Sequence, residues 1–156
     1  MNDEPVYERP HARMIQSGNL ALIGWRDAPK YEDILAWHQL GKSMARAFPE
    51  GSACVSVVVR GTPNFTEDVR SATIKMAADS GIFPMGFAHV ISMPGFAGLA
   101  VRSFVQTVLV LARNPSPSKV FGDAQAASAW LAPRMRETDA GDLARTIRDF
   151  EEALSR

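Results

Sequence analysis

The segment ACVSVVV, residues 53–59, decides the fold of this chain. It is short, rich in β-branched residues and almost wholly apolar, which is typical of a strand buried on both faces of a parallel sheet. On both sides, apolar residues recur at the three- and four-residue spacing of a helix. The preceding segment carries Ile34, Trp37, Leu40, Met44 and Phe48. The following segment carries Phe65, Val69, Ala72, Met76 and Ala77. The centre of the chain is therefore predicted to be helix, buried strand, helix.

The flanking sequence extends this alternation in both directions. Residues 13–17 and 20–25 are separated by the turn-forming pair Gly18-Asn19, which predicts an antiparallel hairpin. Further strands and helices are expected, in chain order, at residues 86–93, 96–113, 119–121, 123–131 and 139–155. Strands that alternate with helices form parallel sheets. We therefore predict an α/β fold with a single-domain, mostly parallel sheet opened by an antiparallel hairpin, with flanking helices and a C-terminal amphipathic helix.

Three segments are expected along the chain. Residues 1–11 are polar and contain proline, which indicates a flexible tail. Residues 12–136 form the domain, and residues 137–156 the terminal helix. The apolar stripe of that helix consists of Leu143, Ile147, Phe150 and Leu154. This stripe is expected to pack either on the domain or on a second chain.

The composition points to a cytoplasmic protein. The chain has 156 residues, with 17 Lys+Arg against 17 Asp+Glu, so its zero formal net charge predicts no general attraction to nucleic acid. A single cysteine, Cys54, excludes an intramolecular disulfide, and residues 1–11 contain no signal peptide pattern. The apolar stretch at residues 96–112 is interrupted by Arg102, Ser103, Gln106 and Thr107. We therefore expect no integral membrane segment.

Several local strings resemble the SpoIIAA-like branch of the STAS superfamily, also described as STAS/Sec14-like. One is the hairpin with its Gly18-Asn19 turn, and another is the valine-rich run at residues 55–59. The C-terminal third carries the most specific strings, Ser92-Met93-Pro94, Pro115-Ser-Pro117, Lys119-Val-Phe-Gly-Asp123 and Ala129-Trp130-Leu131. The likeness spans about residues 12–135. It implies a domain that binds partner proteins, or in some relatives nucleotides or small ligands, and that is generally not an enzyme.

The resemblance does not carry a phosphorylation switch to this chain. In the anti-anti-sigma subfamily, the phosphorylated serine lies in an Asp-Ser-Ser-Gly-like motif after the central strand. The equivalent residues 60–68 lack this motif, and Thr62 and Thr66 are their only hydroxyl side chains. Thr66 is therefore interpreted as a helix cap, with phosphorylation as the alternative. The lipid-binding Sec14-type relatives share no visible headgroup motif with this chain.

No residue set with catalytic or metal-binding spacing stands out. His11, His38 and His89 are far apart in the sequence and form no ligand pair, so neither a metal nor another cofactor is expected. Cys54 has apolar neighbours, which indicates an inert buried thiol. His89, in the middle of a strand, is expected to be hydrogen-bonded in or near the core, close to any pocket there. We expect no enzymatic activity.

The segment at residues 96–113 is apolar around most of its circumference, so it needs cover on more than one side. The cover is the terminal helix, a second copy of the chain or a bound apolar ligand. One hypothesis is a regulatory interaction module that binds a protein partner or homodimerises through this helix and residues 61–66. The alternative is a carrier of a small ligand or lipid, with a pocket near residues 60–64, 93–96 and 122–123, beyond the carboxyl ends of the strands. The candidate partner- or ligand-binding residues are Arg60, Thr62, Thr66, Phe96, Arg102 and Phe104.

Overall fold

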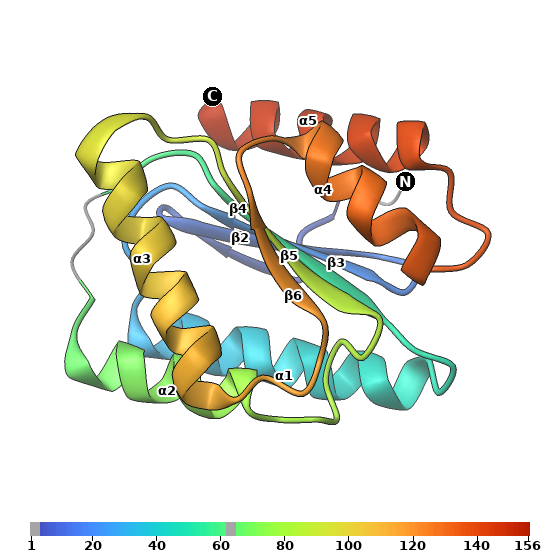
Figure 1. Cartoon of the computed structure of the whole chain (residues 1–156), viewed down its shortest axis with the longest axis horizontal. Coiled ribbons are helices and arrows are strands. Elements are labelled where there is room, and N and C mark those ends of the chain that lie inside the picture. Colours follow the sequence, from blue (N-terminus) through green and yellow to red (C-terminus); the bar gives the residue numbers. More distant parts are fainter. Residues whose placement is uncertain (1–3, 62–64) are drawn as a thin grey trace.

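The computed structural model describes residues 4–61 and 65–156. Within these residues, six strands form one mixed sheet in the order β1-β2-β3-β4-β5-β6 (Figure 1). The strands β1 and β2 are antiparallel to their neighbours, and β3 to β6 run parallel. The strand bounds are β1 Tyr7–Arg9, β2 Ala12–Ser17, β3 Leu20–Trp25, β4 Ala53–Val58, β5 Gly86–Ile91 and β6 Ser118–Phe121. The predicted α/β fold, a mostly parallel sheet opened by a hairpin, is confirmed.

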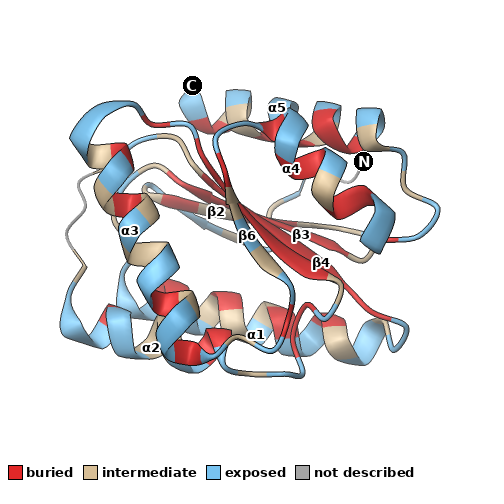
Figure 2. Ribbon diagram, in the orientation of Figure 1, coloured by how far each residue is buried: buried red, intermediate tan, exposed pale blue. Residues whose placement is uncertain are grey.

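Helices cover both faces of the sheet (Figure 1). Their bounds are α1 Tyr31–Ala47, α2 Glu67–Ala77, α3 Gly95–Ala112, α4 Ala124–Leu131 and α5 Ala140–Ser155, with a short 3-10 turn, η1, at Ala132–Arg134. Side chains alternate across the central strand, as its pleat requires. Val55 and Val57 pack under α4 and α5, whereas Cys54 packs on the opposite side, with residues of α1 and α2. The central strands are buried along nearly their whole length (Figure 2), with only Val58 at the end of β4 partly exposed, which explains the almost continuous apolar run at residues 53–59.

The sheet begins earlier than the sequence indicates. Residues 7–9, expected in a flexible tail, form the edge strand β1 and pair with β2. The carboxylate of Asp33 is fully buried and accepts hydrogen bonds from the Tyr7 hydroxyl at 2.6 Å and the Lys30 amide at 2.7 Å. His11 Nε2 lies 2.6 Å from the same carboxylate. A buried carboxylate needs such partners, so Asp33 holds this N-terminal segment on α1. Burial and the bond to Asp33 raise the pKa of Tyr7 to about 12.

The terminal helix α5 packs on its own domain. Its predicted stripe, Leu143, Ile147, Phe150 and Leu154, is buried against β3, β4 and α4. The contact with β3 is close, because a Cβ atom on Gly24 would lie only 2.3 Å from Leu154 Cδ1. Arg26 Nε also donates to the Leu154 carbonyl at 3.0 Å. This places α5 on the sheet face opposite α1, so the alternative in which α5 covers the helix at residues 96–113 is wrong.

The helix α3 is therefore apolar on an inner and an outer face. Val101 and Val108 are buried on its inner face. Its outer face includes Phe96, which is 91% exposed, and Val110, which is 76% exposed. By length and composition alone, these 18 residues are apolar enough to cross a membrane, although 22% of them are buried within the domain. Core helices of soluble proteins can share this composition, so it is weak evidence for a membrane span.

Candidate functional site

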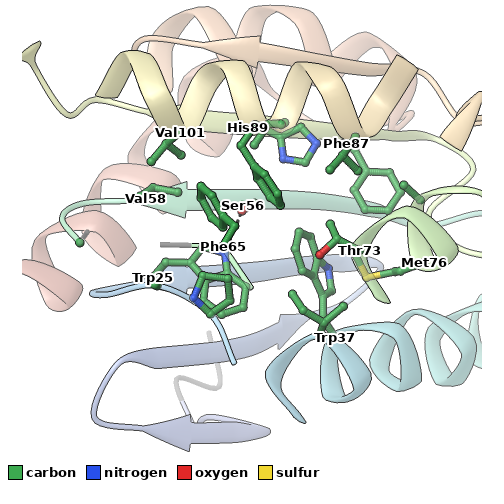
Figure 3. A pocket seen from close by; sticks show the side chains of 18 of the residues that line it. Trp25, Trp37, Ser56, Val58, Phe65, Thr73, Met76, Phe87, His89 and Val101 are labelled. Carbon is green, nitrogen blue, oxygen red and sulfur yellow. Dashed lines mark hydrogen bonds between the residues drawn. The ribbon is translucent and has the colours of Figure 1, made fainter. Parts of the chain in front are cut away.

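A pocket lies between the sheet and the helices α1, α2 and α3. Figure 3 shows side chains from the strands, from α1 and α2, and from α3 surrounding one space. The cavity volume is about 80 Å³, and the pocket is open to solvent on one side. The lining is predominantly apolar. Such a concave apolar site with a few polar atoms is the usual form of a small-molecule site.

Aromatic rings form much of the wall. Trp25, at the end of β3, lies 5.8 Å from Trp37 of α1 between ring centroids, and Trp37 lies 6.2 Å from Phe87 of β5. Phe65, just before α2, stacks on Phe104 of α3, with centroids 3.6 Å apart and planes within 6°. This stacked pair closes the space between α2 and α3. The pocket therefore offers flat apolar surfaces from three directions.

Two polar side chains face the pocket from neighbouring strands. Ser56 of β4 and His89 of β5 are direct partners in the parallel register, so their side chains lie side by side on one face of the sheet. The Trp25 indole N–H donates to Ser56 Oγ at 3.1 Å. His89 stacks on Phe87, with ring centroids 6.0 Å apart and planes within 9°. These side chains form a short polar row on an otherwise apolar floor (Figure 3).

His89 is the unusual member of this row. It is only 7% exposed, and its Nε2 atom has no hydrogen-bond partner among the described residues. The expectation of a hydrogen-bonded core histidine is thus wrong for this nitrogen. Burial lowers the pKa of His89 to about 4, because the charged ring would lose its hydration. The ring is therefore neutral at pH 7, with an unused polar atom inside an apolar pocket.

The pocket opens beyond the carboxyl ends of three parallel strands. Residues 27–29 follow β3, Arg60 and Gly61 follow β4, and Met93 follows β5 in its lining. This agrees with the expected position for residues 60–61 and 93, while residues 62–64 lie outside the described residues. The expected contribution of residues 122–123 is wrong. Asp123 instead caps α4 on the opposite face by accepting a hydrogen bond from the Ala126 amide at 2.8 Å.

The predicted binding residues are divided between the pocket and the surface. Arg60 and Phe104 line the pocket. Arg102 instead ties α3 to β5, because its guanidinium donates to the Ile91 carbonyl at 2.9 Å. Phe96 lies on the outer face of α3, and Thr62 lies outside the described residues.

Thr66 lies at the N-cap of α2, where its hydroxyl donates to the Asp68 carboxylate. That bond lowers the pKa of Asp68. The Thr66 hydroxyl makes no hydrogen bond to the helix amides, so the predicted capping role of this side chain is wrong. Phosphorylation of Thr66 remains a prediction that these contacts do not test.

The remaining reactive groups do not line the pocket. Cys54 is fully buried, and burial raises the pKa of its thiol well above the usual range, so it remains the neutral thiol. His38 Nε2 lies 2.7 Å from the Asp79 carboxylate, and this hydrogen bond lowers the pKa of Asp79. In the described part of the chain, no three His, Cys, Asp or Glu side chains are grouped to hold a metal ion.

The sequence analysis singled out His89 but missed Ser56, although the sequence carries a signal for both. Ser56 is the one polar residue in the run ACVSVVV, and His89 is the one polar side chain in the strand GFAHVI. A polar residue in a strand buried on both faces has to meet a polar partner or a cavity. The alternation along each strand could have placed Ser56 and His89 on opposite faces of their strands from Val55 and Ala88. Their position side by side depends on strand register, which no local pattern gives.

Comparison with protein-family models, curated proteins and solved structures finds no match. The resemblance to the STAS superfamily therefore rests on the quoted sequence strings.

Proposed function

We propose that this chain is a non-enzymatic binding domain for a small, largely apolar molecule, which it holds in the pocket between the sheet and α1, α2 and α3. The observation that carries the proposal is the buried, unpartnered Nε2 of His89 in that pocket. An unsatisfied buried polar atom costs roughly 1–3 kcal/mol. A ligand that hydrogen-bonds to His89 recovers this free energy and also fills the apolar space.

The dimensions of the pocket favour a small ligand over a long acyl chain. A free space of about 80 Å³ is the size of a few water molecules or part of one ring. A long lipid tail would need α3 to move away from the sheet. Arg102 and the Phe65–Phe104 stack both oppose that movement. Of the two ligands predicted from the sequence, the small ligand is therefore the one we retain.

Toluene is a suitable first probe for this proposal, because it is apolar and has one ring. Trp25 and Trp37 line the pocket, whereas Trp130 lies on α4, where it packs against Phe121. In a Trp130→Phe background, tryptophan fluorescence reports only on Trp25 and Trp37. Toluene is expected to change this fluorescence saturably. A signal that stays linear up to the solubility limit of toluene would contradict the proposal.

Two neighbouring substitutions on α3 provide a matched comparison. Val105 is half-buried and lines the pocket, while Thr107 on the same helix is exposed and does not line it. Val105→Phe is expected to fill the pocket and abolish toluene binding. Thr107→Phe adds the same side chain to solvent and should leave binding unchanged. Circular dichroism of both variants verifies that the fold is retained. Equal loss in both variants would show that toluene does not bind in the pocket.

A second function, self-association, is favoured by the outer face of α3. Residues spaced by three and four positions form an uncharged seam there, Phe96, Leu99, Ser103, Gln106 and Val110. All five are exposed. The seam has apolar residues at its ends and polar residues in its middle, so it is complementary to a second, antiparallel copy of itself. This supports the homodimer predicted from the sequence, with α3 as the interface. Its measurable consequence is a dimer mass in solution.

A further inference from the structure

We infer that the ligand of this pocket is a neutral single-ring phenol, with its hydroxyl between Ser56 and His89. The inference rests on the proposed ligand-binding function and specifies the chemical class of the ligand. It follows from three properties of the pocket: the direction of its hydrogen bonds, the shape of its walls and the absence of charge at its inner end.

The hydrogen bonds set the polar group of the ligand. Ser56 Oγ accepts from Trp25, so the Ser56 hydroxyl proton can be donated further into the pocket. Next to it, His89 Nε2 accepts a proton when the other ring nitrogen carries the hydrogen. A hydroxyl group both accepts and donates. A ligand hydroxyl between them completes a chain of donors from Trp25 to Ser56, to the ligand and to His89.

The walls set the shape of the ligand. Trp25, Trp37, Phe87 and Phe104 present flat rings, against which another flat ring packs in offset or edge-to-face contact. The free space of about 80 Å³ is roughly half that of an apolar cavity known to bind benzene, which measures about 150 Å³. One ring can therefore enter only if part of it occupies the section open to solvent. A second fused ring or a long chain would have to extend still further out of the pocket into solvent.

The inner end of the pocket excludes a charged ligand. His89 is neutral there, because burial lowers its pKa to about 4. A carboxylate beside Ser56 and His89 would gain a cationic partner there only if the buried His89 ring became charged, which burial disfavours. Arg60 lines the mouth of the pocket, but it is exposed and follows the end of β4, two positions beyond the strand. A phenol satisfies the polar atoms without carrying charge into the apolar wall.

The test compares four single-ring probes by tryptophan fluorescence in the Trp130→Phe background. Phenol supplies the ring with a donor and an acceptor, anisole has the acceptor alone, toluene has neither, and benzoate is charged. Phenol is expected to bind about tenfold more tightly than toluene or anisole, the equivalent of one or two hydrogen bonds. Benzoate is expected not to bind.

Substitutions in the polar row separate this inference from the proposed function. His89→Leu should reduce phenol affinity to that of toluene and leave toluene affinity unchanged. Ser56→Ala is a second variant for the same comparison, should His89→Leu fail to fold. Ser128→Ala is the control, because Ser128 is equally buried but lies on α4, away from the pocket. It should leave both affinities unchanged.

The outcomes distinguish two failures. Equal affinities for phenol and toluene, both insensitive to His89→Leu and Ser56→Ala, would overturn the phenol inference but leave a small-ligand pocket. Binding of neither probe would overturn the proposed function as well. A preference for benzoate would place the polar recognition at Arg60 and would also overturn the inference.

Discussion

At the scale of single residues, His89 links the pocket to the pH dependence of stability. The pKa of His89 is about 4 in the folded chain, whereas an exposed histidine, as in the unfolded chain, has a pKa of 6.5. The unfolded chain therefore binds the proton more readily. Above pH 6.5 the ring is neutral in both states and adds nothing to the pH dependence. As the pH falls from 6.5 to 4, protonation of the unfolded chain progressively removes stability. A ring with hydrogen-bonded nitrogens and more solvent would not behave in this way.

The corresponding prediction concerns the His89→Leu variant. We expect the free energy of unfolding of the wild type, measured relative to this variant, to fall by on the order of 3 kcal/mol between pH 6.5 and pH 4. Urea titrations of both proteins at a series of pH values provide the measurement. Acidic residues such as Asp79 contribute equally to both chains, so their effect cancels. A difference that stays constant with pH would contradict the buried, neutral state of His89.

At the scale of elements, the position of α3 depends on one close approach to the end of β5. A Cβ atom built on Gly98 would lie 1.9 Å from the Met93 carbonyl oxygen, so no larger residue fits without a backbone shift. This contact, together with the bond from Arg102 to Ile91, fixes the helix over the pocket. The inner face of α3 is thus held by the same residues that close the site, while its outer face remains exposed.

Gly98→Ala should therefore disturb the fold and the pocket together. We expect it to lower the free energy of unfolding by about 1–3 kcal/mol, the usual effect of forcing extra atoms into a close contact, and to weaken toluene binding. Gly122→Ala is the matched control, because a Cβ atom there meets nothing within 4 Å. Thermal and urea denaturation measure the stability. Equal stability of both variants would show that α3 does not depend on the approach at Gly98.

At the scale of the whole molecule, the sequence predicts helices and strands well where the apolar pattern extends over many residues. The continuous apolar runs of β4 and β5 and the apolar faces of α1, α2 and α5 indicated these elements, because burial on one or both faces leaves such patterns. The strand β1 has no such pattern, since it is a three-residue edge strand with Glu8 and Arg9 exposed. Its place depends on the buried carboxylate of Asp33, a contact between residues 22 to 26 positions apart.

The site is less predictable than the fold, because it too depends on contacts between residues that are far apart in the sequence. The rule that ligands bind beyond the carboxyl ends of parallel strands pointed to Arg60 and Met93, and both residues line the pocket. The polar row of Ser56 and His89 arises from the register between β4 and β5, which is a property of the assembled sheet. The exposure of α3 depends on which face of the sheet receives α5. The sequence patterns of α3 and α5 do not determine which face of the sheet each helix covers.

The exposed seam on α3 leads to a prediction about the whole molecule in solution. If two copies pair through antiparallel α3 helices, Phe96 and Leu99 of one copy lie against Val110 of the other. Light scattering during size exclusion should then give twice the mass of the 17.0 kDa chain. Val110→Lys places a charge in this apolar contact and should yield monomers, because a buried unpaired charge strongly opposes association. Leu35→Lys is the control, since Leu35 is also exposed and apolar but lies on α1. A wild type that stays monomeric at every concentration, or a Val110→Lys variant that remains dimeric, would exclude α3 as the interface.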